Sequence, residues 1–186
     1  MKVKIKDTLL NSKAFSRTIS RLAHEILEEN QGTENLAVVG MRTRGEFLAK
    51  RLAKKIEEIE GTEIPVGVLD VTLYRDDFRT NLKQPEILVT DLPFSIDRKN
   101  IILVDDVLFT GRTVRSALDA LMDYGRPSRI QLVIMVDRGH RELPIKADFV
   151  GKRVRTLLNE EVRVKIKEYD EEEDAVHLVE IIEEEN

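Results

Sequence analysis

The stretch IILVDDVLFTGRTV (residues 101–114) decides the fold. Four apolar residues come first, then Asp105 and Asp106, and then a Thr-Gly-Arg-Thr sequence that leads into a further apolar pattern. A short apolar run of this kind is typical of a buried strand, and the turn residues after it are typical of a helix start. We therefore expect the two carboxylates to emerge where a buried strand over residues 100–104 gives way to a loop.

Strands and helices alternate on both sides of this stretch. Apolar residues recur at helical spacing over residues 15–27, with Ser12 as the expected N-cap of that first helix. The other expected elements are strands over 36–40, 64–74 and 129–136, helices over 45–59 and 113–124, and a closing hairpin over 162–166 and 176–182. The alternation predicts an α/β fold with a central, mostly parallel sheet flanked by helices, and we expect residues 1–186 to form a single domain. In such sheets ligands bind at the carboxyl ends of the strands.

Composition limits where the protein works and what it binds. The chain of 186 residues contains no cysteine, which excludes a disulfide framework and any thiolate metal site. Its start, MKVKIKDTLL, lacks the apolar core of a signal peptide, and no apolar run approaches the roughly 20 residues of a membrane-spanning helix. We therefore expect a cytoplasmic protein. The formal net charge is −5, but the acidic excess lies mainly in residues 168–174 and 183–185, so a local basic face can still bind nucleic acid.

The two halves of the opening stretch suit the two ends of a sugar phosphate. Backbone N–H groups at the start of the second helix form an anion site, to which the hydroxyls of Thr110 and Thr113 add donors. Asp105 and Asp106 repel a phosphate, but they can accept hydrogen bonds from a vicinal diol or approach a Mg²⁺ ion. The rival motifs G-x-x-x-x-G-K-[ST] and G-x-G-x-x-G after a strand are absent from the sequence. The stretch therefore predicts a ribose phosphate site.

VDDVLFTGRT resembles the phosphoribosyl diphosphate (PRPP) motif of type I phosphoribosyltransferases. The segments GMRTRG (40–45), LDVTLYRDD (69–77), YGRP (124–127) and VDRGHRELPIKADFVGK (136–152) extend the resemblance to the PyrR family, over residues 21–152. Members of that family regulate pyrimidine genes by binding leader RNA, as in transcription attenuation, and also act as uracil phosphoribosyltransferases. The resemblance implies PRPP, uracil and UMP as ligands, an RNA hairpin as partner, and a homodimer or larger homo-oligomer.

The resemblance also implies which residues form the substrate site. Thr43 and Arg44 match the loop that holds the diphosphate, Asp105 and Asp106 match the carboxylates on the ribose hydroxyls, and Arg138 matches a residue near the base and diphosphate. Those matched to the 5′-phosphate loop are Val107, Leu108, Phe109, Thr110, Gly111, Arg112 and Thr113. Val162 belongs to a segment that approaches the pyrimidine in the family.

Catalysis is expected to be mainly electrostatic, carried by Asp105, Asp106, Arg44 and Arg138 with Mg²⁺ that arrives with PRPP. The histidines His24, His140 and His177 show no metal-ligand spacing, so no metal held by the protein alone is expected. The polar segment 75–85 has no apolar period and is expected to form a hairpin flap. It would carry Arg75, Asp76 and Asp77 over the site to exclude water.

A second set of residues matches positions that the family uses for its RNA hairpin. Ser20, Arg21 and His24 share one face of the first expected helix, together with Arg17. Alone, such a face is an ordinary solvated surface. The full matching set is Ser20, Arg21, His24, Thr43, His140, Arg141, Lys146 and Lys152. By resemblance it would gather positive charge on one face of an acidic protein.

Residues 151–162 depart from the family's pattern, and this leaves alternatives open. They read GKRVRTLLNEEV where the family commonly has Gly-Lys-Asn-x-Pro-Thr-Ser, but Lys152, Thr156, Glu160 and Val162 are kept. Phe109 replaces a usual tyrosine and Lys146 a usual arginine. One alternative is a phosphoribosyltransferase for another base, such as orotate or a purine, without an RNA role. The other is a nucleotide-sensing RNA regulator without turnover.

Overall fold

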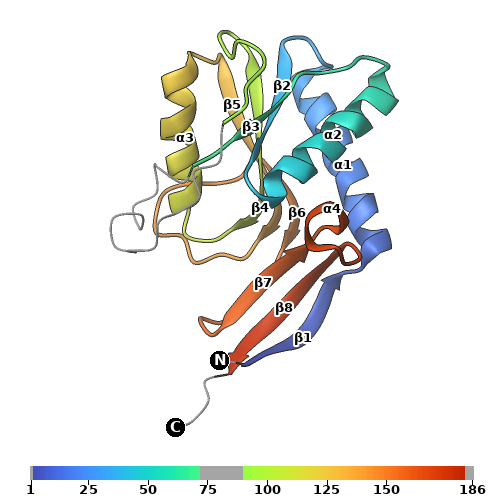
Figure 1. Cartoon of the computed structure of the whole chain (residues 1–186), viewed down its shortest axis with the longest axis vertical. Helices are drawn as coiled ribbons and strands as arrows, with labels where there is room; N and C mark the ends of the chain where they lie inside the picture. The colour runs from blue at the N-terminus through green and yellow to red at the C-terminus, as the bar shows by residue number, and fades with distance from the viewer. Residues whose placement is uncertain (1, 72–89, 183–186) are drawn as a thin grey trace.

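The computed structural model describes residues 2–71 and 90–182, and within them the strands form two sheets (Figure 1). A five-stranded parallel sheet has the strand order β3-β2-β4-β5-β6, and a three-stranded antiparallel sheet has the order β1-β8-β7. The strands are β1 (Lys2–Leu10), β2 (Leu36–Met41), β3 (Val66–Leu69), β4 (Asn100–Leu108), β5 (Arg129–Asp137), β6 (Phe149–Arg153), β7 (Glu160–Lys165) and β8 (Ala175–Ile182). The helices are α1 (Ser12–Asn30), α2 (Arg44–Glu60), α3 (Arg112–Tyr124) and α4 (Lys167–Asp170).

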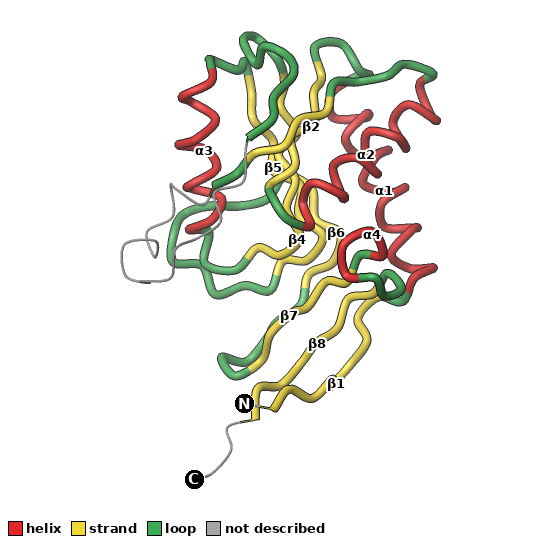
Figure 2. Tube along the Cα trace, viewed as in Figure 1, coloured by secondary structure: helices red, strands yellow, loops and turns green. Residues whose placement is uncertain are grey.

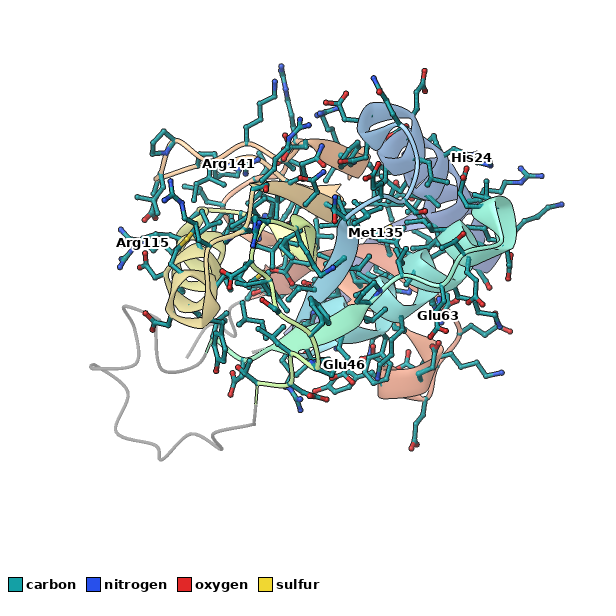
Figure 3. The ribbon with its side chains drawn as sticks, turned by 90° about the horizontal axis from the view of Figure 1, so that it is seen from above. His24, Glu46, Glu63, Arg115, Met135 and Arg141 are labelled. Carbon is teal, nitrogen blue, oxygen red and sulfur yellow. The ribbon has the colours of Figure 1, made fainter. Side chains whose placement is uncertain are left out.

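Helices cover the parallel sheet on both faces, which explains the continuous apolar run of β4. Ile102 and Val104 pack in one core cluster with α1 and α2, whereas Ile101 and Leu103 pack in a second cluster with α3. Figure 2 shows α3 on one side of the sheet and α1 with α2 on the other. Met135 of β5 lies in the middle of the molecule between these layers and is almost fully buried (Figure 3). These findings confirm the expected α/β class with a parallel central sheet.

The strand that carries the two aspartates is longer than expected. Strands 36–40 and 129–136 and helices 45–59 and 113–124 match the structure within one residue at each end. However, β4 does not end at residue 104, because it stays paired with β5: Asp105 pairs with Ile134, and Leu108 with Asp137. The expectation that the aspartates emerge in a loop is therefore wrong. They lie in the last, half-buried part of a paired strand, so their backbone positions are fixed by the sheet.

Two other element ends differ from expectation. The N-cap of α1 is Asn11 rather than Ser12, because the Asn11 side chain accepts a hydrogen bond of 2.9 Å from the backbone N–H of Ala14. Strand β3 spans four residues, 66–69, of the expected 64–74. The end of that expected strand lies outside the described residues, as does the expected hairpin flap with Arg75, Asp76 and Asp77.

The closing hairpin is confirmed, and it forms part of a sheet that the sequence did not reveal. Strands β7 and β8 pair antiparallel, with Val164 opposite Val176. Strand β1 pairs with the other edge of β8, so the start of the chain lies beside its end, with Ile5 opposite Val179. In Figure 1 this small sheet extends below the parallel sheet, and α4 lies in the connection between β7 and β8. Among the described residues, no helix is long and apolar enough to cross a membrane.

Candidate active site

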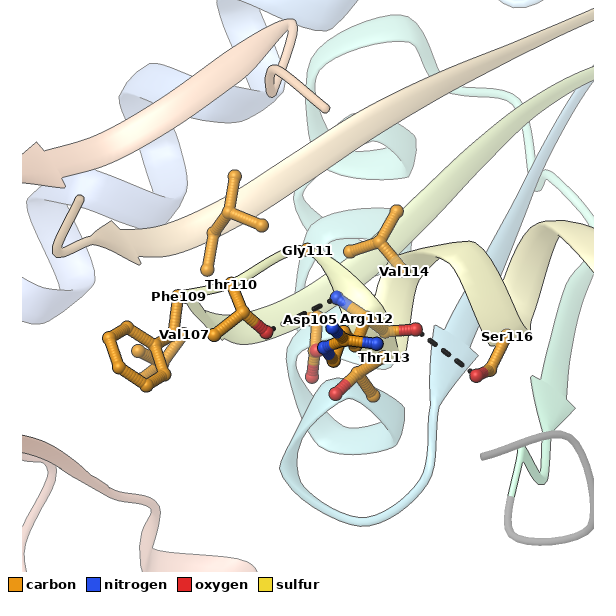
Figure 4. A pocket seen from close by; sticks show the side chains of 10 residues that line it. Asp105, Val107, Phe109, Thr110, Gly111, Arg112, Thr113, Val114 and Ser116 are labelled. Carbon is orange, nitrogen blue, oxygen red and sulfur yellow. Dashed lines mark hydrogen bonds between the residues drawn. The ribbon is translucent and has the colours of Figure 1, made fainter. Parts of the chain in front are cut away.

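A cavity of about 440 Å³ lies at the carboxyl end of β4, where the chain passes into α3 (Figure 4). Its lining includes Asp105 and every residue from 107 to 113, together with Val114 and Ser116. This is the set of residues expected to hold a ribose phosphate, apart from Asp106. The structure thus brings the two halves of the sequence motif around one space, at the sheet edge where parallel α/β folds bind ligands.

The turn between β4 and α3 depends on a glycine. Gly111 has φ 92°, a left-handed conformation that other residues adopt at a cost, and it is the N-cap residue of α3. Thr110 Oγ1 accepts a hydrogen bond of 3.3 Å from the backbone N–H of Arg112, and the Ser116 hydroxyl donates to the Arg112 carbonyl at 3.1 Å (Figure 4). The first turn of α3, whose N–H groups have no intrahelical acceptors, therefore borders the cavity.

The two aspartates are held by backbone hydrogen bonds. Asp105 Oδ1 accepts from the N–H of Asp106 at 2.9 Å, and Asp106 Oδ1 accepts from the N–H of Val107 at 2.8 Å. Burial raises the pKa of Asp106, while the hydrogen bond from Val107 and the positive charge of Arg44 oppose that rise. The side chain of Asp105, which lines the cavity, and that of Asp106, which does not, are thereby held by the backbone before any ligand binds.

The segment GMRTRG folds back tightly against β4. A Cβ atom added to Gly40 would lie 2.5 Å from the carbonyl oxygen of Gly45, and one added to Gly45 would lie 2.5 Å from the carbonyl oxygen of Val104. The two glycines therefore permit the loop to approach the backbone beside the aspartates. Thr43, at the start of α2, is half-buried and makes no side-chain capping hydrogen bond.

Arg44 points its guanidinium group at the C-terminal segment of the chain. Its Nε donates to Asp170 Oδ2 at 3.0 Å and its Nη2 donates to Asp170 Oδ1 at 2.6 Å. The guanidinium carbon lies 5.0 Å from the centre of the Tyr169 ring. The hydrogen bond to Asp170 raises the pKa of Arg44, and the nearby charge of Asp106 adds to that rise. Sequence reasoning missed Asp170, because in the sequence it is one of several acidic residues in a charged tail.

Arg138 is buried beside the cavity, with only 6% of its surface exposed. Its Nη2 donates to the carbonyl of Glu160 at 2.5 Å and its Nε donates to Thr156 Oγ1 at 3.1 Å. The guanidinium carbon lies 4.1 Å from the centre of the Phe109 ring, and burial lowers the pKa of Arg138. Thr156 and Glu160, which are kept in the otherwise altered segment 151–162, thus hold Arg138 in place. Val162 is buried in the core further along β7.

His140 and Arg141, expected to contact RNA, lie next to the cavity. The His140 ring centre is 5.9 Å from that of Phe109, and its Nε2 lies 2.7 Å from the Thr156 carbonyl oxygen. Arg141 forms an ion pair with Asp137 at 2.5 Å and donates to the Phe109 carbonyl at 2.7 Å. Its Nε donates to the backbone of the following turn at 3.0 Å. Its guanidinium group is therefore engaged in holding the start of the cavity loop.

The other residues of the expected RNA set lie on the side of α1 and β6. Arg21 donates to the carbonyl of Gly151 at 2.5 Å, and Lys152 donates to the carbonyl of Leu9 at 2.9 Å. Ser20 bonds within α1, His24 is exposed, and Lys146 is exposed just before β6. In Figure 3, His24 on α1 and Arg141 lie well apart. The expected set therefore divides into an α1–β6 group (Ser20, Arg21, His24, Lys146 and Lys152) and a cavity group (His140 and Arg141), with Thr43 apart at the start of α2.

Comparison with known proteins agrees with this geometry. Residues 6–172 match the phosphoribosyl transferase domain family. The chain is 56% identical over 173 residues to the bifunctional protein PyrR of Pelotomaculum thermopropionicum, covering 93% of this chain and 96% of that protein. It is 57% identical over 176 residues to the bifunctional protein PyrR of Thermus aquaticus, covering 95% and 97%.

Solved structures show the same fold at lower sequence identity. A hypoxanthine phosphoribosyltransferase from Staphylococcus aureus superposes with a TM-score of 0.69 at 21% identity, covering 93% of this chain and 92% of that one. The hypoxanthine phosphoribosyl transferase of Trypanosoma cruzi gives a TM-score of 0.71 at 16% identity, with 94% and 91% covered. The parallel sheet, the cavity at the end of β4 and these relatives together lead to one assignment: the chain belongs to the PyrR family and has the type I phosphoribosyltransferase fold.

Proposed function

We propose that this chain is a pyrimidine-responsive regulator that binds the leader RNA of pyrimidine genes and also converts uracil and PRPP to UMP and diphosphate. The observation that carries the proposal is the cavity at the end of β4, which is lined by the residues of the PRPP motif. Membership of the PyrR family supports both halves of the proposal. Transcription attenuation is the mode of control that the resemblance implies.

In the proposed reaction, N1 of uracil forms a bond to C1′ of the ribose while the bond from C1′ to the diphosphate oxygen breaks. The diphosphate leaves with the electron pair, and uracil loses its N1 proton. The N-terminal turn of α3 and the hydroxyls of Thr110 and Thr113 would hold the 5′-phosphate. Asp105 and Asp106 would accept hydrogen bonds from the ribose hydroxyls. Holding both ends of the ribose places C1′ between base and diphosphate, which removes much of the entropic barrier.

Two arginines from different elements act on residues of this site: Arg138 lies over the Phe109 ring, and the charge of Arg44 acts on Asp106. Arg44, at the start of α2, would stabilise the negative charge of the departing diphosphate. Arg138, which lies over Phe109, would face the base and the diphosphate. Both guanidinium groups are already fixed by hydrogen bonds in the structure, so little reorganisation is needed when charge develops. Val162, which the resemblance assigns to the pyrimidine segment, is buried in the core on the β7 side.

The carboxylates of Asp105 and Asp106 fit a role beside Mg²⁺. Carboxylate oxygens are ligands that Mg²⁺ prefers, and it commonly binds one or two of them together with substrate phosphates. No cluster of three or more His, Cys, Asp or Glu side chains able to hold a metal occurs within residues 2–71 and 90–182. The two aspartates would therefore share a cation with oxygens of PRPP. Bound in this way, Mg²⁺ neutralises charge on the diphosphate.

The RNA half of the proposal rests on the α1–β6 group. Arg21, His24 and Lys146 are exposed there, on a chain whose net charge is −5. Positive side chains on one face give a phosphate backbone a local binding surface despite the overall charge. Assembly into a homodimer or larger homo-oligomer, which would repeat this face, and a cytoplasmic location belong to the proposal and rest on the resemblance.

The enzymatic half is tested by product formation from PRPP and Mg²⁺, with uracil, orotate, hypoxanthine and adenine supplied separately. We expect UMP from uracil alone. The matched control is the double variant Asp105→Asn with Asp106→Asn, which should fold but lose turnover because it cannot hold the diol. Product from another base would favour the plain phosphoribosyltransferase. A chain that binds PRPP but forms no product would favour the silent nucleotide sensor.

The regulatory half is tested by RNA binding with and without UMP, over a range of salt concentrations. We expect saturating UMP to strengthen binding to a pyrimidine-leader hairpin by about 5- to 150-fold, the usual range of coupling between two sites. Lys146→Ala should lower the salt dependence by about one counterion, because it removes one phosphate contact. His140→Ala should weaken RNA binding more than turnover. An RNA affinity that UMP leaves unchanged would refute the regulatory role.

A further inference from the structure

The diphosphate-loop arginine is fixed by a carboxylate from the far end of the chain. Asp170 binds Arg44 through both carboxylate oxygens, at 3.0 and 2.6 Å. The Asp170 side chain is only 6% exposed, and its Oδ2 also accepts a hydrogen bond of 2.9 Å from the backbone N–H of Ile166. Burial alone would raise the pKa of Asp170, but the hydrogen bonds from Arg44 and Ile166 outweigh burial, so its pKa lies below the ordinary value. Asp170 is therefore a charged and rigid partner.

The ion pair between Arg44 and Asp170 leaves one edge of the Arg44 guanidinium group available to a ligand. A guanidinium group has five N–H donors in a plane, and a bidentate carboxylate uses one from Nε and one from Nη2. Among the described residues, Arg44 Nη1 makes no hydrogen bond. The Tyr169 ring, 5.0 Å from the guanidinium carbon, restricts its position further. The charge of Asp106 also acts on Arg44, so this cation is close enough to the ribose site to influence it.

We propose that Asp170 is a positioning residue for the transfer reaction: it orients Arg44 so that the remaining N–H donors face the diphosphate of PRPP. This inference rests on the proposed function and assigns a role to a segment that the reaction did not otherwise use. Asp170 would act on the diphosphate through Arg44; its other ion pair, with Lys165 at 3.7 Å, lies within the C-terminal segment. Losing it would free a flexible side chain to adopt many orientations, and a small misplacement of a charge-stabilising group costs a large factor in rate or affinity.

A second ion pair between the same two elements provides the matched control. Arg51, two turns further along α2, binds Asp174 at 2.7 Å and also pairs with Glu168. Like Arg44 with Asp170, it ties α2 to the segment around α4, but Arg51 lies about 10 Å further along the helix. If these ion pairs only attach the C-terminal segment to α2, removing either carboxylate loosens that attachment, less so for Asp174 because Arg51 keeps Glu168, and has no selective effect on PRPP. If Asp170 positions Arg44, only the Asp170 variant changes the handling of PRPP.

The experiment compares Asp170→Asn, Asp170→Glu and Asp174→Asn by steady-state kinetics, and by calorimetric titration with inorganic diphosphate and Mg²⁺. We expect Asp170→Asn to raise the KM for PRPP about tenfold and to weaken diphosphate binding by a similar factor, with the KM for uracil unchanged. Asp170→Glu, which keeps the charge, should recover most of the loss. Asp174→Asn should stay close to wild type. Equal effects of Asp170→Asn and Asp174→Asn on the KM for PRPP would overturn the proposal.

A double-mutant cycle with Arg44→Ala keeps the test decisive if Asp170→Asn folds poorly. Because Asp170 acts through Arg44, Asp170→Asn should weaken diphosphate binding in the wild-type background and have no further effect when Arg44 is alanine. Additive losses would overturn the positioning role. A wild-type chain that forms no UMP would refute the enzymatic half of the proposed function, whereas diphosphate binding would still decide the role of Asp170.

Discussion

Replacing Thr156 by valine removes a hydrogen bond from the buried side of Arg138 while keeping the shape of the side chain. Thr156 Oγ1 accepts from Arg138 Nε at 3.1 Å, and only 7% of Thr156 and 6% of Arg138 are exposed. Water therefore cannot replace the lost acceptor easily. The Thr156 hydroxyl also donates a longer hydrogen bond of 3.4 Å to the Arg138 carbonyl, so the variant removes both contacts of this hydroxyl. Arg138 would keep its bond to the Glu160 carbonyl and its contact with Phe109.

The structure sets the size of the expected effect. A hydrogen bond to a charged group contributes about 1.5–3 kcal/mol, and leaving a buried donor without an acceptor costs a similar amount. We expect Thr156→Val to lower the free energy of unfolding by about 2 kcal/mol, a factor of about 30 in the ratio of folded to unfolded protein. For a chain of this size that loss corresponds to a fall in Tm of about 5 °C. Turnover should also fall, because the loosened arginine borders the cavity.

Urea unfolding followed by circular dichroism, together with uracil turnover, measures both effects. The control is Thr8→Val, which removes a threonine hydroxyl that lies 3.2 Å from His177 Nδ1 on the exposed small sheet. At that exposed site water replaces the lost partner, so we expect Thr8→Val to lower the free energy of unfolding by less than about 0.5 kcal/mol. The prediction is refuted if the free energy of unfolding of Thr156→Val lies within about 0.5 kcal/mol of the wild-type value, or if Thr156→Val and Thr8→Val lower it equally.

Three further changes test other parts of the site. Asp106→Asn should abolish turnover and stabilise the protein by about 1 kcal/mol at pH 7.5. Burial raises the pKa of Asp106 above its ordinary value of 3.8, so the stability of the wild-type protein falls as pH rises through the pKa of the folded state. In urea unfolding at pH 4, Asp106→Asn should therefore stabilise the protein less than it does at pH 7.5. Gly45→Ala places a Cβ atom 2.5 Å from the Val104 carbonyl oxygen. The substitution should lower the free energy of unfolding in urea by about 2 kcal/mol and weaken PRPP binding. Unchanged stability and PRPP affinity would contradict the close approach of the two backbones. Arg141→Lys loses the guanidinium group that donates to the Phe109 and Leu108 carbonyls, so PRPP affinity should fall while the salt dependence of RNA binding stays constant. If Arg141→Lys instead reduces by about one the slope of log RNA affinity against log salt concentration, Arg141 contacts an RNA phosphate.

The sequence alone predicted those parts of the structure that depend on local patterns of apolar and turn residues. The continuous apolar run before Asp105 predicted a strand buried on both faces. Residues 107–113, which the resemblance assigns to the 5′-phosphate, lie together around one cavity. Strand β1 could have been found, because Val3 and Ile5 alternate with lysines in the sequence. Its apolar period was hidden by its charged residues, because Lys2, Lys4 and Lys6 make its start resemble a solvated segment. The single-domain prediction and the roles of the individual site residues stay predictions.

Long-range pairs of charged and polar groups could not be predicted in the same way. Arg44 and Asp170 are 126 positions apart, and a sequence with 35 acidic residues offers many partners of the same kind. Only the folding of the C-terminal segment against α2 selects among them. The longer extent of β4 has a similar origin, because its last residues are extended by pairing with β5 rather than by their own propensity. Two aspartates in sequence are more typical of a loop.

The pairing of β1 with β8 also bears on the order in which the protein is made. A ribosome synthesises residues 2–10 well before their partner strand, residues 175–182. The nascent chain can therefore complete the parallel sheet while β1 still has no partner and Arg138 still lacks the Thr156 hydroxyl and the Glu160 carbonyl. The small sheet and the contacts of Arg138 are therefore completed only after the segments that contain Thr156, Glu160 and residues 175–182 have been synthesised.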